Sequence, residues 1–100
     1  MASSVGSSGK FIAGEKAVTT SGTEVALATT GTYSSVVIIA KAANTNQIYV
    51  GGSDVTTSTN DGLDAGDSLT IAPRGGGIVL SDIYIDADTD GEGVDFYAVA

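Results

Sequence analysis

Three aspartates with alternating spacing are the residues best suited to chemistry in this sequence. Asp86, Asp88 and Asp90 are each separated by one residue and are followed by Gly91, which matches the first half of a calcium-binding loop. Alternate carboxylates can converge on one hard cation, and the glycine permits a sharp turn. The second half of the pattern is missing, because the position of its last glutamate is Tyr97. Two interpretations stay open: a calcium site, or an acidic turn between strands.

Residues for catalysis are scarce. The chain has no histidine and no cysteine, so serine lacks an imidazole base and no thiolate can act as nucleophile or metal ligand. Asp64 and Asp67 have the residue types of a glycosidase pair, but aspartates in a glycine-rich stretch usually form turns. The glycine-rich runs 6–10 and 75–77 do not open a helix, as a phosphate-binding loop must. The sequence therefore predicts that the protein is not an enzyme.

Tyrosine offers a different chemistry, the recognition of a sugar by an aromatic ring. A flat apolar ring with a polar rim suits a carbohydrate. Alternatively, these rings fill sheet faces with the hydroxyl at an edge, and we favour this because the sequence shows no clustering. The four residues concerned are Tyr33, Tyr49, Tyr84 and Tyr97.

Charge is divided unevenly along the chain, whose 100 residues carry a net charge of −8. The first half has three lysines and two glutamates, whereas the second half has one arginine, nine aspartates and one glutamate. Such an acidic half repels phosphate backbones, so nucleic acid is not an expected partner. The longest apolar run, residues 36–40, is far shorter than the ~20 residues of a membrane helix, and no signal peptide is visible. We expect synthesis in the cytoplasm and no membrane partner.

The sequence predicts that these residues lie on or between short strands. Apolar runs alternate with turn residues every 8–12 residues or so, and no segment has helical periodicity. The pattern predicts an all-β fold, an antiparallel β-sandwich of about eight short strands, with a jelly roll favoured over an immunoglobulin-like sandwich. The longest run is expected to be buried on both faces. The expected strands are 10–13, 16–19, 24–29, 33–43, 48–50, 68–72, 78–85 and 93–99, with a short one at 55–57. A turn at Gly14 is expected between the first two.

The first ten residues are mostly serine, glycine and alanine, the composition of a flexible arm. We therefore divide the chain into an N-terminal arm, residues 1–10, and a single β-sandwich domain, residues 11–100. An arm of this kind becomes ordered only when a neighbouring surface holds it. The candidates for that contact are Val5, Lys10, Phe11 and Ile12.

Three segments of the second half carry a resemblance to a known family. They read IYVGGSDVT at 48–56, GLDAGDSLTI at 62–71 and LSDIYI at 80–85. This pattern is similar to that of small structural proteins of tailed-phage virions, over about half of the chain. The resemblance implies a viral structural protein: a bacteriophage capsid decoration, or cement, protein on the capsid surface of the virion. Its partners would be the major capsid protein and further copies of itself, as a homo-oligomer, with a trimer expected. The alternative that the family allows is a tail or fibre component, or a carbohydrate-binding module for host attachment.

Overall fold

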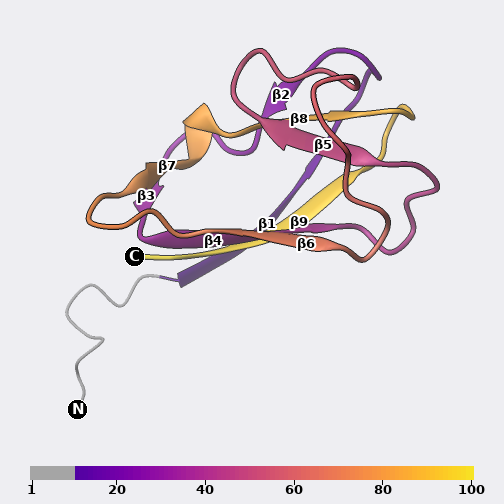
Figure 1. Ribbon diagram of the computed structural model, residues 1–100. Helices are drawn as coiled ribbons and strands as arrows, with labels where there is room; N and C mark the ends of the chain where they lie inside the picture. Colours follow the sequence, from indigo (N-terminus) through magenta and orange to yellow (C-terminus); the bar gives the residue numbers. More distant parts are fainter. Residues whose placement is uncertain (1–10) are drawn as a thin grey trace.

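The computed structural model describes residues 11–100 (Figure 1). The predicted arm, including Val5 and Lys10, lies outside the described residues. The elements in chain order are β1 (Phe11–Ala17), β2 (Val25–Ala26), β3 (Thr32–Tyr33), β4 (Ser35–Ala40), β5 (Ile48–Gly51), β6 (Ser68–Ile71), β7 (Ile78–Val79), the 3₁₀ helix η2 (Leu80–Asp82), β8 (Tyr84–Ala87) and β9 (Gly93–Val99).

The strands pair into three antiparallel sheets. One has four strands in the order β1-β9-β4-β6, one has three in the order β2-β8-β5, and β3 pairs with β7. Figure 1 shows the four-stranded and three-stranded sheets as two layers. The predicted all-β antiparallel sandwich is therefore confirmed, and the jelly-roll connectivity stays a prediction.

The core lies between these two layers and follows the alternation of the strands. In β4, Val36, Ile38 and Ala40 are buried, whereas Val37 and Ile39 point to the other side and are only partly buried. The expectation that this run is buried on both faces is wrong, because no described segment packs over the outer side of the sheet. From the opposite layer, the core receives Ile48, Ile85 and Ala87, and from the connections it receives Val18, Leu27, Leu80 and Ile83.

The first strand corrects another prediction. Two short strands with a turn at Gly14 were expected, but β1 is continuous and pairs with β9 over its whole length. A Cβ at Gly14 would lie 2.5 Å from ring carbon Cζ of Phe96, so this glycine makes room for a core aromatic ring instead of turning the chain.

Other predicted strands are divided or shorter in the structure. The run 33–43 is divided between β3 and β4, and the run 78–85 is divided by η2. The run 24–29 retains only the two residues of β2, and residues 55–57 form no strand. The last strand matches its prediction, Gly93–Val99.

Candidate functional site

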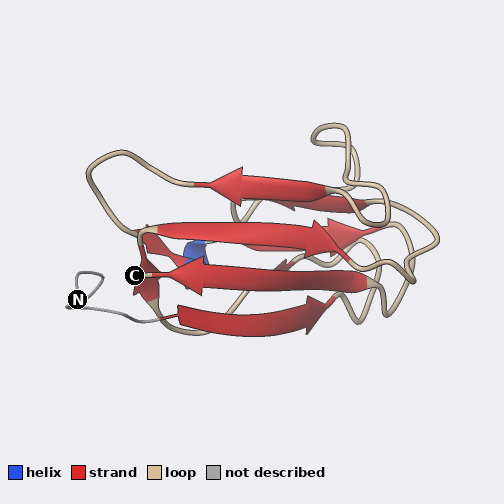
Figure 2. Cartoon of the chain, turned by 90° about the horizontal axis from the view of Figure 1, so that it is seen from below, coloured by secondary structure: helices blue, strands red, loops and turns tan. Residues whose placement is uncertain are grey.

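The outward side of the four-stranded sheet is the candidate site, and we call it the bare face because no described segment packs over it. Figure 2 looks onto this sheet, with β1 at its lower edge. Strand alternation and the pairing register place the side chains of this face in rows across the strands. Its members are Phe11, Ala13, Glu15, Ser35, Val37, Ile39, Ser68, Thr70, Asp95, Tyr97 and Val99.

One end of the bare face is apolar. Phe11, Tyr97 and Val99 expose 62%, 42% and 43% of their surfaces, which is high for large hydrophobic side chains. The Phe11 and Tyr97 rings stack with centroids 6.2 Å apart and planes inclined by 11°. Contiguous exposed apolar surface usually marks a place where another molecule binds. This end therefore has the character of a contact surface.

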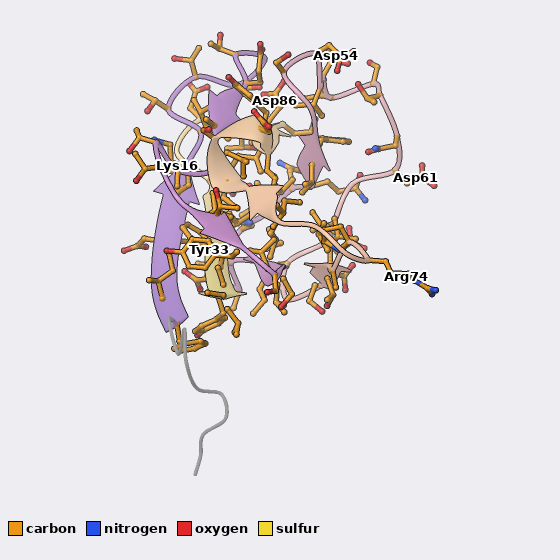
Figure 3. The ribbon with its side chains drawn as sticks, turned by 90° about the vertical axis from the view of Figure 1, so that its left-hand side faces the viewer. Lys16, Tyr33, Asp54, Asp61, Arg74 and Asp86 are labelled. Atoms are coloured by element: carbon orange, nitrogen blue, oxygen red, sulfur yellow. The ribbon has the colours of Figure 1, made fainter. Side chains whose placement is uncertain are left out.

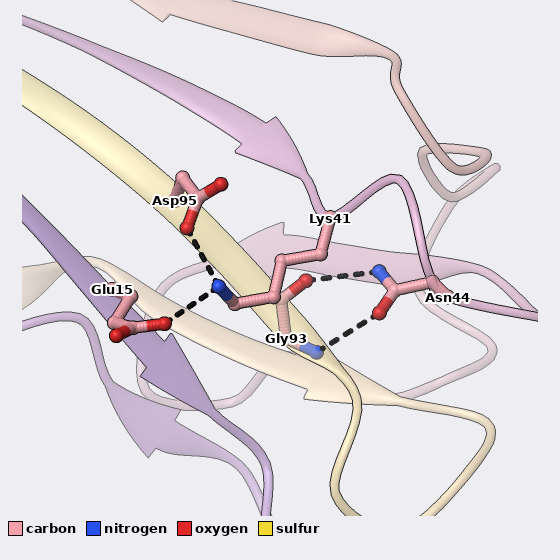
Figure 4. Close-up of polar contacts among 5 residues, drawn as sticks. All are labelled: Glu15, Lys41, Asn44, Gly93 and Asp95. Atoms are coloured by element: carbon pink, nitrogen blue, oxygen red, sulfur yellow. Dashed lines mark hydrogen bonds and ion pairs between the residues drawn. The ribbon is translucent and has the colours of Figure 1, made fainter.

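The other end of the bare face is charged. Glu15 and Asp95 lie directly opposite each other on β1 and β9, a like-charge pairing that alone would be unfavourable. The Lys41 ammonium lies between them, with Nζ 2.6 Å from Glu15 Oε1 and 2.7 Å from Asp95 Oδ1 (Figure 4). Its hydrogen bonds to Asp95 and then Glu15 raise the pKa of Lys41 above its ordinary value. The lysine therefore holds the two carboxylates together.

The segment that carries Lys41 is itself anchored to β9. The Asn44 side chain donates from Nδ2 to the Gly93 carbonyl at 2.9 Å and accepts from the Gly93 N–H at Oδ1 at 3.3 Å (Figure 4). Nearby, the Glu92 carboxylate accepts hydrogen bonds from the N–H and hydroxyl of Thr45 and from the N–H of Asn46. These hydrogen bonds lower the pKa of Glu92. The turn that follows β4 is thus fixed against the start of β9.

A shallow hollow lies between the two ends of the bare face. Its volume is about 350 Å³, and its lining consists of Ala13, Gly14, Glu15, Asp95 and Tyr97. An aromatic ring beside two carboxylates can stack on a sugar ring and accept hydrogen bonds from its hydroxyls. Because Lys41 already bonds one oxygen of each carboxylate, the hollow resembles a binding site more than a catalytic pair.

Asp86, from the predicted calcium loop, lies in the three-stranded sheet and is 1% exposed. Figure 3 shows its side chain among the other labelled residues. Its Oδ1 accepts the Gly22 N–H at 3.0 Å and the Ala87 N–H at 2.8 Å, whereas Oδ2 has no hydrogen-bond partner. Asp86 therefore anchors the turn that contains Gly22.

The other two aspartates of that motif bond elsewhere. Asp90 Oδ1 accepts the Ser21 N–H at 2.7 Å, and Asp88 Oδ2 accepts the Tyr49 hydroxyl at 3.0 Å. Within residues 11–100, no group of three or more acidic, histidine or cysteine side chains is arranged to hold a metal ion. The arrangement therefore gives the calcium interpretation no support, and the three carboxylates act as separate hydrogen-bond acceptors.

The remaining predicted residues are dispersed. Tyr33 and Tyr49 are 7% and 6% exposed and Tyr84 is partly buried, so the four tyrosines form no common platform. Asp67 Oδ2 accepts the Asp64 N–H at 3.0 Å, which makes this pair part of a turn. Of the predicted contact residues, Phe11 belongs to the bare face, whereas Ile12 packs against the core. Sequence reasoning missed Lys41, since it comes near its two carboxylates only because β9 pairs with both β1 and β4.

Comparisons with known proteins add no family to this site. The chain matches no protein-family model, no curated protein and no solved structure. Among residues 11–100, no helix has the length and apolar character that a membrane crossing requires. The function is therefore inferred from the bare face and from the sequence resemblance.

Proposed function

We propose that this protein is a decoration, or cement, protein on the exterior of a tailed-phage capsid. The phage assignment comes from the sequence resemblance of residues 48–85, and the observation that carries the binding mode is the exposed apolar cluster of Phe11, Tyr97 and Val99. A protein that acts by attachment needs such a cluster on a rigid surface. A sheet face supplies one, because neighbouring strands fix the side chains in place.

The proposed mechanism is bridging. The bare face would lie across neighbouring major capsid protein subunits and remove apolar surface of both partners from water. Complete burial of a fully exposed large apolar side chain contributes roughly 1.5–3 kcal/mol, and covering these three half-exposed residues contributes about half of that for each. They would form the central part of an interface. On another side of the molecule, Asp54 and Asp61 project into solvent (Figure 3), which suits a virion surface. The chain would be synthesised in the host cytoplasm and would attach to the capsid by non-covalent contacts alone.

Particle binding by surface variants tests this proposal. Tyr97→Ser should lower the number of copies retained on purified particles, with the apparent dissociation constant rising about tenfold or more. Val79→Ser is the matched control, because Val79 is 37% exposed but lies on β7, away from the bare face. Copies are counted against the major capsid protein by quantitative mass spectrometry. Equal losses for both variants, or no loss for Tyr97→Ser, would contradict the proposed surface.

A second candidate function is recognition of a host glycan by a tail or fibre component. The hollow beside Tyr97, with the Glu15 and Asp95 carboxylates on its wall, favours it. A glycan array with the purified chain, followed by NMR mapping of any hit, distinguishes the two functions. Glycan-dependent shifts at Ala13, Tyr97 and Asp95, with only a few copies per particle, would favour attachment over decoration.

A further inference from the structure

The free edge of β1 differs from the other sheet edges among the described residues. β1 is seven residues long, contains no proline, and keeps an uninterrupted register with β9. At the opposite edge of the same sheet, β6 has four residues, and Pro73 follows soon after it. In the three-stranded sheet, β2 has two residues, and the free side of β5 is bridged at Ile48 by Leu63. A long edge without proline or a covering segment is a template for another strand, and a partner must accommodate the charges of Glu15 and Lys16.

The hydrogen-bonding groups of this edge can be assigned. The Val18 N–H, which continues the ladder, donates to the Glu92 carbonyl at 2.8 Å. In an antiparallel pair, alternate residues direct both backbone groups toward the partner strand. Residues 12, 14 and 16 therefore face β9, and residues 11, 13, 15 and 17 direct N–H and C=O groups away from the sheet. These four residues present a regular ladder that is unpaired within the described chain.

We propose that β1 pairs antiparallel with β1 of a second copy of this chain, about a two-fold axis at Gly14. An axis perpendicular to the sheet keeps both bare faces on the same side. Bare-face side chains of one copy therefore meet only bare-face side chains of the other. Ala13 then lies opposite Glu15 of the second copy, Ile12 opposite Lys16, and Phe11 opposite Ala17. The contact is isologous and closes after two copies, so it does not by itself produce a trimer.

Charge and overlap select this register. With the axis at Gly14, all seven residues of β1 pair, and neither Glu15 nor Lys16 lies directly opposite a like charge. The two Glu15 carboxylates are diagonal neighbours, and each is bonded to Lys41 of its own copy. Moving the axis to Glu15 opposes the two Glu15 carboxylates, which is destabilising, and leaves five paired residues. Moving it to Ala13 also leaves five. The Gly14 register therefore gives the longest ladder while placing no like charges directly opposite each other.

Pairing would also double the bare face. Four strands spaced by ~4.8 Å and about six residues long, at ~3.3 Å per residue, give a sheet face of roughly 400 Å². Specific interfaces bury about 800 Å² per partner. One copy supplies about half of this area, whereas a continuous eight-stranded sheet of two copies supplies about all of it. Self-pairing would thus enlarge the surface that the proposed function needs, although the pairing itself does not depend on that function.

Opposite charges introduced at Ala13 test the pairing without any particle. Ala13→Lys places an ammonium opposite Glu15 of the second copy, and Ala13→Glu places a carboxylate there, twice in each dimer. Sedimentation equilibrium of the full-length chain from about 10 μM to about 1 mM should show the dissociation constant falling for Ala13→Lys and rising for Ala13→Glu, at least tenfold apart. Asn60→Lys and Asn60→Glu, in an exposed loop, control for net charge and should stay within threefold of each other. Equal behaviour of the two Ala13 variants, or monomers throughout for wild type and Ala13→Lys, would overturn the proposal.

A proline variant distinguishes a dimer contact through the β1 edge from one through the bare face. The N–H of Ala13 points away from β9, so Ala13→Pro removes an edge donor while leaving the ladder with β9 intact. It should keep a folded NMR spectrum and lose the dimer, whereas Tyr97→Ser should keep the dimer and lose particle binding. A folded Ala13→Pro variant with wild-type dimerisation would refute the edge contact and leave the decoration function standing. Loss of dimer in both variants would instead place the contact on the face and refute the β1 ladder.

Discussion

The two outer faces of the sandwich carry similar residues, but the exposure of these residues differs. On the three-stranded sheet, Tyr49 and Asp86 lie opposite each other on β5 and β8, point away from the core, and are 6% and 1% exposed. On the bare face, Tyr97 and Phe11 also point away from the core but are 42% and 62% exposed. Both faces display aromatic and acidic side chains, and only one of them is covered.

The cover on the three-stranded sheet is the connection between β5 and β6. Val55 in this connection is 1% exposed, and a Cβ at Gly51 would lie 3.1 Å from Val55 Cβ. A Cβ at Gly62 would lie 3.0 Å from ring carbon Cε2 of Tyr49, so the returning chain also runs close to the ring. We call this side, with Tyr49, Val55 and Asp86, the covered face. Its third layer is supplied by the chain itself.

The two faces differ in whether the described chain covers the side chains that point away from the core. The covered face is covered by the connection between β5 and β6, which buries Tyr49 and Val55. The bare face has an apolar surface and, among the described residues, no lid. Because apolar burial is the main favourable term in association, we expect a partner molecule to bind the bare face and cover it. The same substitution should therefore cost more stability on the covered face than on the bare face.

Truncating one tyrosine on each face should give the largest contrast. Tyr49→Ala removes a ring packed under the covering loop and should lower the free energy of unfolding by about 3 kcal/mol. Tyr97→Ala removes a half-exposed ring and should cost less than about 1 kcal/mol. Urea denaturation of both variants measures the pair. Similar losses would mean that the two faces are equally covered in solution.

Removing Asp86 should have the next largest effect. Asp86→Ala leaves the Gly22 N–H without its acceptor and frees the turn between β1 and β2, at a cost of about 2 kcal/mol. Asp86→Asn keeps an acceptor oxygen and should remain closer to wild type.

Thermal melts in calcium and in chelator test the calcium interpretation separately. A melting temperature that rises with calcium in wild type and not in Asp86→Asn would restore the calcium interpretation.

The all-β architecture could be predicted from the sequence, whereas the candidate functional surface could not. Alternation in residues 93–99 is a local property, so it predicted β9 correctly. Gly14 was misread as a turn because its role depends on Phe96, far along the chain. In the same way, Asp86, Asp88 and Asp90 have suitable spacing for a metal, but their separate partners Gly22, Tyr49 and Ser21 come from distant segments. Tertiary contacts of this kind leave no local signal.

Alkaline pH should affect the covered face selectively. Burial raises the pKa of Tyr49, and its hydrogen bond to Asp88 raises it further. The folded protein therefore holds this proton more tightly than the unfolded chain, so the resulting stability is present below the unfolded pKa of about 10 and is lost as the pH rises through the folded value. Tyr49→Phe should lose about 1 kcal/mol at neutral pH and should show a shallower loss from pH ~9 to ~12. A loss over this pH range as steep in Tyr49→Phe as in wild type would contradict the prediction.

The smallest effect is expected at the charged end of the bare face, and it bears on how that face keeps its shape without a lid. Lys41→Met leaves Glu15 and Asp95 opposed across β1 and β9, so the melting temperature should fall. Glu15→Gln in the same chain removes the repulsion, so the double variant should melt closer to wild type than Lys41→Met does. The Lys41 side chain is 32% exposed, which keeps the coupling small and makes it weaken at about 1 M salt. Additive losses from the two substitutions would contradict the coupling. Recovery in the double variant would mean that Lys41 stabilises the pairing of β1 and β9 by neutralising two opposed carboxylates. The covered face is instead stabilised by a buried tyrosine.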